Sequence, residues 1–122
     1  MLALCVDIIN GYRASKGLSA LARSAELDAY AATAAESDDG TRQRHRHFYR
    51  TRGGGIARAE NEIPWWPLTS GDPRDVIRDG TAAMGAEGPG GGHYENLIGA
   101  HTEVGCGVFV NGDRVTVVQA FR

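Results

Sequence analysis

The sequence contains a single lysine, two cysteines and no long hydrophobic run. No segment approaches the roughly 20 consecutive apolar residues of a membrane-crossing helix, so we expect no membrane span. The first residues also lack the basic start and the small-residue cleavage site that are typical of a signal peptide. A longer precursor could still be secreted, because this expectation concerns only these 122 residues.

Because Lys16 is the only lysine, arginine carries almost all of the positive charge. Five arginines form a local cluster, and they are Arg42, Arg44, Arg46, Arg50 and Arg52. Such a cluster could hold phosphate or nucleic acid, but the formal net charge of the chain is −2 and the basic run is short. We therefore expect no nucleic-acid partner and interpret the cluster as a solvated basic loop.

The two cysteines, Cys5 and Cys106, lie far apart in the sequence. In an oxidising compartment they could form one bridge that closes nearly the whole chain, and otherwise they would be two buried thiols. The sequence leaves both alternatives open, because pairing requires Cα atoms about 4.4–6.8 Å apart. Cys106 stands between glycines in a strand-like pattern, which indicates a small core residue rather than a nucleophile.

The chain is long enough for one modest core, which at this size buries roughly two-thirds of the surface of the unfolded chain. It has no internal repeat and no change of composition that would mark a boundary. We therefore expect one domain over residues 1–122 and a monomer.

Three segments have the apolar spacing of helices. Residues 2–13 form the first, and residues 25–37 form an alanine-rich second helix that the hydroxyl of Ser24 caps. Residues 38–40, Asp-Asp-Gly, are expected to end this second helix. The third covers residues 72–84, because an acidic N-cap followed by proline is a strong helix start.

The β-structure is expected mostly at the end of the chain. Residues 102–110 and 114–121 alternate as strands do, and Asn111-Gly112 between them is a strong signal for a type I′ hairpin. Residues 56–63 are predicted to form a short extended segment. Helices first and strands last indicate an α+β layered domain rather than a βαβ repeat.

Two other segments are predicted to be loops. Residues 41–55 are polar, arginine-rich and then glycine-rich, which favours a mobile loop that carries His45 and His47. Trp65, Trp66 and the following proline are predicted to form an aromatic loop. This loop would either cover the edge of the core or line a ligand groove.

Residues 90–107 give the chain its most distinctive stretch, in which a glycine-rich approach presents His93 and then passes directly into a strand. No phosphate-binding loop, serine-nucleophile elbow or zinc-finger cysteine spacing is present. The remaining candidates for chemistry are His45, His47, Glu60, Glu62, Glu87 and His93. Two imidazoles and a carboxylate can hold Zn²⁺ with an open position for water, although spacing alone favours ordinary surface residues.

Five short motifs in order resemble those of the CAP superfamily, which comprises cysteine-rich secretory, antigen 5 and pathogenesis-related 1 proteins. Residues 9–21 are similar to the family's opening N-x-x-R-x-x-x-G-L-x-x-L pattern. Residues 59–61, Ala-Glu-Asn, are similar to its Gly-Glu-Asn, and residues 93–97, His-Tyr-Glu-Asn-Leu, to its His-x-x-Asn-Ile/Leu. Residues 102–107 and 118–121 complete a match to compact bacterial members over nearly the whole chain.

The resemblance implies a three-layer α-β-α sandwich with a surface cleft that holds two histidines and two glutamates. By position, Glu60 and His93 match one glutamate and one histidine of the family, and Glu87 matches the second glutamate. The other histidine is His45 or His47. His45 is preferred because Phe48 follows it at a position that is apolar in bacterial members.

The sequence also departs from the family pattern. Ile9 stands where the family has a histidine, Ala59 replaces the glycine of Gly-Glu-Asn, and Met84 replaces a helix tryptophan. A glycine-rich spacer separates Glu87 from His93.

The leading hypothesis from this resemblance is a secreted CAP-type domain that binds a divalent metal, with zinc as the natural choice for imidazole and carboxylate ligands. Its partner would be an extracellular lipid, peptide or protein, contacted through Asn61, Trp65 and Trp66. One alternative is a lipid- or sterol-binding module without a metal. Another is a metal-dependent hydrolase with Glu60 as its base, although the sequence supports no specific reaction.

Overall fold

The computed structural model describes residues 1–122 and contains one four-stranded sheet in the order β1-β3-β4-β2. The strands are β1 (Ala22–Arg23), β2 (Ala59–Pro67), β3 (Glu103–Asn111) and β4 (Arg114–Phe121). Only the short pairing of β1 with β3 is parallel, and the other two pairings are antiparallel. The C-terminal hairpin therefore forms the centre of the sheet, and β2 forms one edge.

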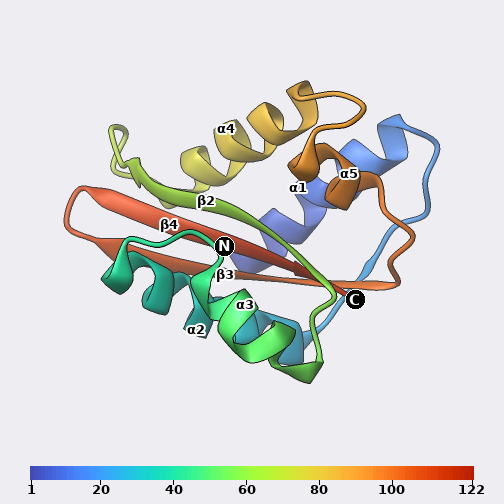
Figure 1. The fold of residues 1–122 in the computed structure, drawn as a ribbon. Coiled ribbons are helices and arrows are strands. Elements are labelled where there is room, and N and C mark those ends of the chain that lie inside the picture. The colour runs from blue at the N-terminus through green and yellow to red at the C-terminus, as the bar shows by residue number, and fades with distance from the viewer.

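Helices cover both faces of the sheet (Figure 1). Helix α2 (Ala25–Thr41), the short α3 (Arg46–Thr51) and a 3-10 turn (Arg52–Gly55) lie on one face. Helices α1 (Leu2–Ser15), α4 (Pro73–Ala86) and α5 (Gly92–Ile98) lie on the other. The predicted three-layer α-β-α sandwich is confirmed. None of the helices combines the length and the apolar character that crossing a bilayer demands.

Strand β4 contributes to both halves of the core because its side chains alternate between the two faces of the sheet. Val115, Val117 and Phe121 belong to the cluster that packs under α1 and α4. Val118 and Ala120 belong to the smaller cluster against α2. All five side chains are fully buried, so the hairpin joins the two outer layers.

Helix α2 approaches the sheet so closely that β3 needs glycine beneath it. A Cβ atom at Gly107 would collide with the backbone of Ala31 and Ala32, and one at Gly105 would collide with the backbone of Asp28. The small side chains of α2 therefore rest directly on the main chain of β3. This explains two glycines that the sequence showed only as part of a strand pattern.

The two cysteines form a disulfide that ties α1 to the central strand β3. The Cα atoms of Cys5 and Cys106 are 6.4 Å apart, and 101 residues separate them in the sequence. Both residues are fully buried. The alternative of two free thiols is therefore wrong, and the expectation that Cys106 is a core residue is confirmed.

The predicted end of α2 was wrong, because the helix continues past Asp38 and Asp39. Both aspartates are buried and accept hydrogen bonds from distant parts of the chain. Asp38 accepts from the backbone N–H of His47, and Asp39 accepts from the side chains of Asn111 and Thr116. Asp38 and Asp39 would favour a turn by their local sequence, and these tertiary contacts stabilise them in the helix instead.

Three further predictions of local structure were also wrong. Residues 41–55, predicted as a loop, contain α3 and the 3-10 turn. Trp65 and Trp66, predicted in an aromatic loop, lie within β2, where the pairing with β4 shifts register and Trp65 adopts a φ of 35°. His93 lies in α5 rather than at the entry to a strand.

Candidate functional site

A cleft of about 760 Å³ opens between α3 and α5 at the edge of the sheet, beside β2. Its walls combine aromatic, charged and glycine residues. They include His45, Phe48, Tyr49, Arg58, Ala59, Glu60, Glu87, Gly91, Gly92, His93, Glu95 and Asn96. A second cavity of about 390 Å³ shares His45, Glu87 and His93 with it. We call the two cavities the larger arm and the smaller arm of one cleft.

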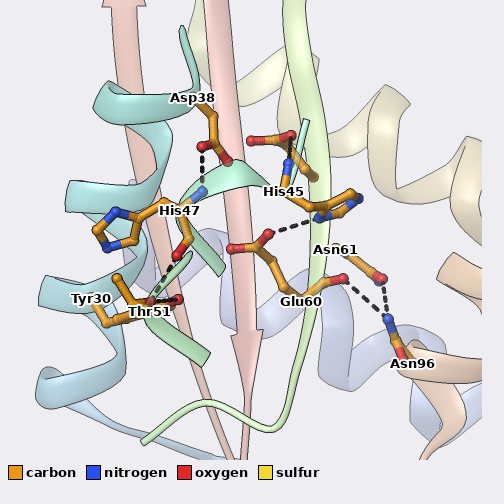
Figure 2. Close-up of polar contacts among 9 residues, drawn as sticks. Tyr30, Asp38, His45, His47, Thr51, Glu60, Asn61 and Asn96 are labelled. Carbon is orange, nitrogen blue, oxygen red and sulfur yellow. Dashed lines mark hydrogen bonds and ion pairs between the residues drawn. The ribbon is translucent and has the colours of Figure 1, made fainter. Parts of the chain in front are cut away.

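His45 reaches the cleft from the residue that precedes α3, where its φ of 58° places the backbone in the left-handed region. Two glutamates of β2 hold this conformation. The backbone N–H of His45 donates to Glu62 Oε1 over 3.0 Å, and its ring Nδ1 lies 2.7 Å from Glu60 Oε2 (Figure 2). A backbone conformation that is uncommon for histidine is thus fixed by tertiary contacts.

His93 reaches the cleft from the first turn of α5 and pairs with Glu87, which follows the end of α4. Its ring Nδ1 lies 2.6 Å from Glu87 Oε2, and its backbone N–H donates to Glu87 Oε1 over 3.1 Å. The glycine-rich spacer makes this pairing possible. Gly88 and Gly90 have positive φ, and a Cβ atom at Gly91 would collide with Glu87.

Two asparagines fasten α5 to β2 and so position His93 relative to Glu60. The side-chain amide of Asn96 donates to the carbonyl of Glu60 over 3.1 Å and to Asn61 Oδ1 over 2.9 Å (Figure 2). The amide of Asn61 donates to the carbonyl of His93 over 3.1 Å. Asn61 is fully buried, so its place is structural, whereas the sequence analysis proposed it as a ligand contact.

The histidines come from opposite layers of the sandwich, yet their ring centres are only 6.4 Å apart. In each ring Nδ1 bonds a carboxylate, which leaves Nε2 without a hydrogen bond. A glutamate that accepts from Nδ1–H fixes the tautomer in which Nε2 has a free lone pair for a metal. The donor set therefore fits a metal through two imidazoles, although no group of three His, Cys, Asp or Glu side chains is placed to hold a metal ion together.

His47, Trp65 and Trp66 have different positions relative to this cleft. The ring of His47 packs against Tyr30 with 5.4 Å between ring centres, and it lines neither arm (Figure 2). Trp66 lines the smaller arm, while Trp65 lies beneath two guanidinium groups of the arginine cluster, those of Arg42 and Arg44. The structure thus brings together His45, Glu60, Glu87 and His93, and it leaves His47 outside.

Three buried carboxyl groups, those of Asp38, Glu60 and Glu62, lie behind His45, and the sequence did not indicate that Asp38 joins the two glutamates. Glu62 is 3% exposed and Asp38 is fully buried. Burial, together with a side-chain hydrogen bond to Asp38, raises the pKa of Glu62 to about 9. Asp38 Oδ2, Glu60 Oε1 and Glu62 Oε2 are buried without a hydrogen-bond partner, which is the setting in which a carboxyl group retains its proton. No sequence signal links Asp38 to Glu62, because their contact is wholly tertiary.

The two glutamates that contact histidine differ in electrostatic environment. Burial raises the pKa of Glu60, and the hydrogen bond with His45 opposes this effect. The hydrogen bond with His93 lowers the pKa of Glu87, which lies near the surface. The two carboxyl groups are therefore shifted in opposite directions, with Glu87 the more readily ionised of the two.

Comparison with known proteins agrees with the fold and the motif order. A family model described as the CAP, or cysteine-rich secretory protein, family matches residues 6–121. The chain belongs to the CAP family. A sequence search of curated proteins gives no match.

Two solved structures share the CAP fold with this domain. A hookworm platelet inhibitor superposes with a TM-score of 0.61 at 14% identity, covering 98% of this chain and 67% of the inhibitor. A cysteine-rich secretory protein from Staphylococcus aureus superposes with a TM-score of 0.60 at 13% identity, covering 99% of this chain but only 38% of the longer protein. At these identities the likeness concerns the fold.

Proposed function

We propose that this CAP domain binds a divalent metal ion, with zinc the first candidate, through Nε2 of His45 and Nε2 of His93. The observation that carries the proposal is the matched arrangement of two His–Glu pairs across one cleft. Glu60 and Glu87 would act behind the histidines, by orienting the rings and increasing their basicity as ligands. Water or a bound ligand would occupy the remaining coordination positions, where the metal would act as a Lewis acid.

We also propose that the domain works outside the cytoplasm as a binding protein for an extracellular ligand. Two observations support this part of the proposal. The Cys5–Cys106 disulfide is typical of oxidising compartments, and CAP proteins are commonly secreted.

Isothermal titration with Zn²⁺ tests the metal proposal. We expect the wild type to bind zinc and both His93→Ala and His45→Asn to lose most of the affinity. Asparagine is chosen at position 45 because it tolerates positive φ better than most residues. His47→Ala is the matched control, because His47 is close in sequence but lines neither arm. Equal zinc affinity in the wild type and in a folded His93→Ala variant would overturn the proposal.

A second candidate function, binding of an apolar ligand without a metal, is favoured by the composition of the smaller arm. Ile63, Pro64, Trp66 and Met84 all line it. We expect such binding to survive His93→Ala and to be lost in Trp66→Ala. Pull-down with immobilised lipids or other apolar ligands measures both variants, and binding that depends on His93 alone would contradict this candidate.

A further inference from the structure

The larger arm of the cleft carries an aromatic side chain that the fold leaves uncovered. Tyr49 of α3 lines this arm and is 72% exposed, whereas the other exposed large hydrophobic residues, Met1 and Val110, lie outside the cleft. The ring of Tyr49 meets the rings of His45 and Phe48 nearly at right angles, with 6.3 Å and 5.8 Å between ring centres. These contacts hold the ring at the wall of the arm without stacking on it.

The wall around Tyr49 also holds polar groups that have no partner within the protein. The hydroxyl of Tyr49 and the guanidinium of Arg58 form no hydrogen bond or ion pair, and both residues are exposed. The side-chain amide of Asn96 donates to Glu60 and Asn61, which leaves Asn96 Oδ1 free to accept. One arm therefore offers a donor, an acceptor and a hydroxyl that can act as either.

The charges of the larger arm favour a neutral ligand. Its three glutamates, Glu60, Glu87 and Glu95, disfavour an anionic ligand. Each of them already has a hydrogen-bond partner within the protein, so none is left unpartnered to receive a cation. A neutral molecule with many hydrogen-bonding groups is therefore the best match.

We propose that the larger arm binds a neutral oligosaccharide, with one sugar ring packed against Tyr49. A sugar ring has an apolar face of C–H groups, which is attracted to the negative face of an aromatic ring. Its hydroxyls both donate and accept, so they can satisfy Arg58 and Asn96 Oδ1 at the same time. The volume of about 760 Å³ lies within the roughly 300–1,000 Å³ of small-ligand sites.

An acyl chain fits the larger arm less well than a sugar does. Only Phe48, Tyr49 and Ala59 contribute apolar side chains to it. An acyl chain would also leave Arg58 and Asn96 Oδ1 without hydrogen-bonding partners, and burying such groups unpaired costs free energy.

An extended peptide is disfavoured for a different reason. Residues 60–63 of β2 are buried, so the strand offers no open edge to which a peptide could pair. The oligosaccharide inference builds on the proposed role in binding an extracellular ligand, and it names the class of that ligand. It does not require the metal.

The probe is an array of neutral and acidic oligosaccharides of equal length, screened with the labelled protein. Isothermal titration of the best ligand follows, in the presence of EDTA so that no metal contributes. We expect at least one neutral member to bind with a Kd below about 1 mM. Acidic members of the same length should bind more weakly, because the glutamates of the arm repel them.

Tyr49→Ala tests the location, and it should weaken binding of the best ligand by about tenfold or more. Tyr49→Phe keeps the ring and should retain most of the affinity. Arg58→Ala should weaken binding by about threefold or more through the loss of a donor. Arg50→Ala is the matched control for both alanine variants, because Arg50 is an exposed neighbour in α3 that lies outside both arms.

Three results would overturn the oligosaccharide proposal. The first is that no neutral member of the array binds with a Kd below about 1 mM. The second is that Tyr49→Ala binds the best ligand as tightly as the wild type does. The third is that acidic oligosaccharides bind more tightly than neutral ones of the same length. Zinc titration of the wild type is independent of all three, so failure here leaves the metal proposal to its own test.

Discussion

The rings of His45 and His93 lie 6.4 Å apart between their centres, and each is held by a glutamate from the element that also positions its backbone. For His45, the support is the edge strand β2, which provides both Glu60 and Glu62. For His93, Glu87 alone bonds both the ring and the backbone N–H. The pair therefore depends on the two helical layers meeting at the edge of one strand.

Glu87→Gln should weaken zinc binding without unfolding the protein. The glutamine keeps a side-chain acceptor but loses the charge that increases the basicity of His93, and such changes typically cost 10- to 100-fold in metal affinity. Competition with a chromophoric chelator measures the affinity. Glu95→Gln is the matched control, because Glu95 lines the same arm and bonds the backbone N–H of Gly90 rather than a histidine. Unchanged zinc affinity in Glu87→Gln would contradict this role.

Zinc affinity should also fall in acid. An imidazole must be neutral to donate its lone pair, so protons compete with the metal and we expect binding to weaken below about pH 6. Titrations at pH 5 and pH 7.5 with a single buffer anion measure the effect. The same affinity at both values would indicate that carboxylates, rather than His45 and His93, bind the metal.

Glu62→Gln should make the protein less sensitive to alkali. The pKa of Glu62 is raised to about 9 in the folded protein from an ordinary value near 4.5, so the folded state binds the extra proton between these values. The contribution of Glu62 to stability is therefore fully present below about pH 4.5 and is lost as pH rises toward 9. Glutamine cannot ionise and can still accept from His45 and donate to Asp38.

Urea unfolding at pH 5 and pH 8 tests this expectation. Between pH 5 and pH 8, the wild type should lose about 1–3 kcal/mol more of its free energy of unfolding than Glu62→Gln loses. Glu36→Gln, on the exposed side of α2, controls for the loss of one carboxylate. A pH dependence in Glu62→Gln equal to that of the wild type would show that Glu62 is not the buried acid.

The sequence predicted the elements that depend on local chemistry. The hairpin around Asn111-Gly112, the capping by Ser24 and the helix start at Asp72 are all present, because turns and caps are decided by a few neighbouring residues. The order of the family motifs placed Glu60 and His93 in one cleft.

Contacts between distant segments could not be predicted in the same way. Asp38 appeared as a helix end because its carboxylate is used by His47 and Glu62, which are close only in the folded chain. Helix α5 was missed because it is short and follows a glycine run. The resemblance favoured His45 over His47 through the position of Phe48, but no local pattern signals the positive φ with which His45 enters the cleft.

Gly107→Ala should destabilise the fold by about 1–3 kcal/mol, as an added methyl group must push α2 away from β3. Thermal or urea unfolding measures the change. Gly11→Ala is the matched control, because Gly11 lies in α1 with open space around its missing Cβ atom. That substitution should stabilise by about 0.5–1 kcal/mol through helix propensity. Equal effects of the two substitutions would contradict the close packing of α2 on β3.

Loss of the disulfide should lower the free energy of unfolding by about 3–5 kcal/mol. The bridge links residues 101 apart, and cross-links that close long loops restrict the unfolded chain most in the chain-entropy view. Urea unfolding of the wild type with and without a reductant measures the loss, and a Cys5→Ala/Cys106→Ala variant should match the reduced protein and show no response to the reductant. If reduction leaves the wild type unchanged, the packing of α1 on β3 is stable without the bridge, and the disulfide instead reflects the compartment in which the protein folds.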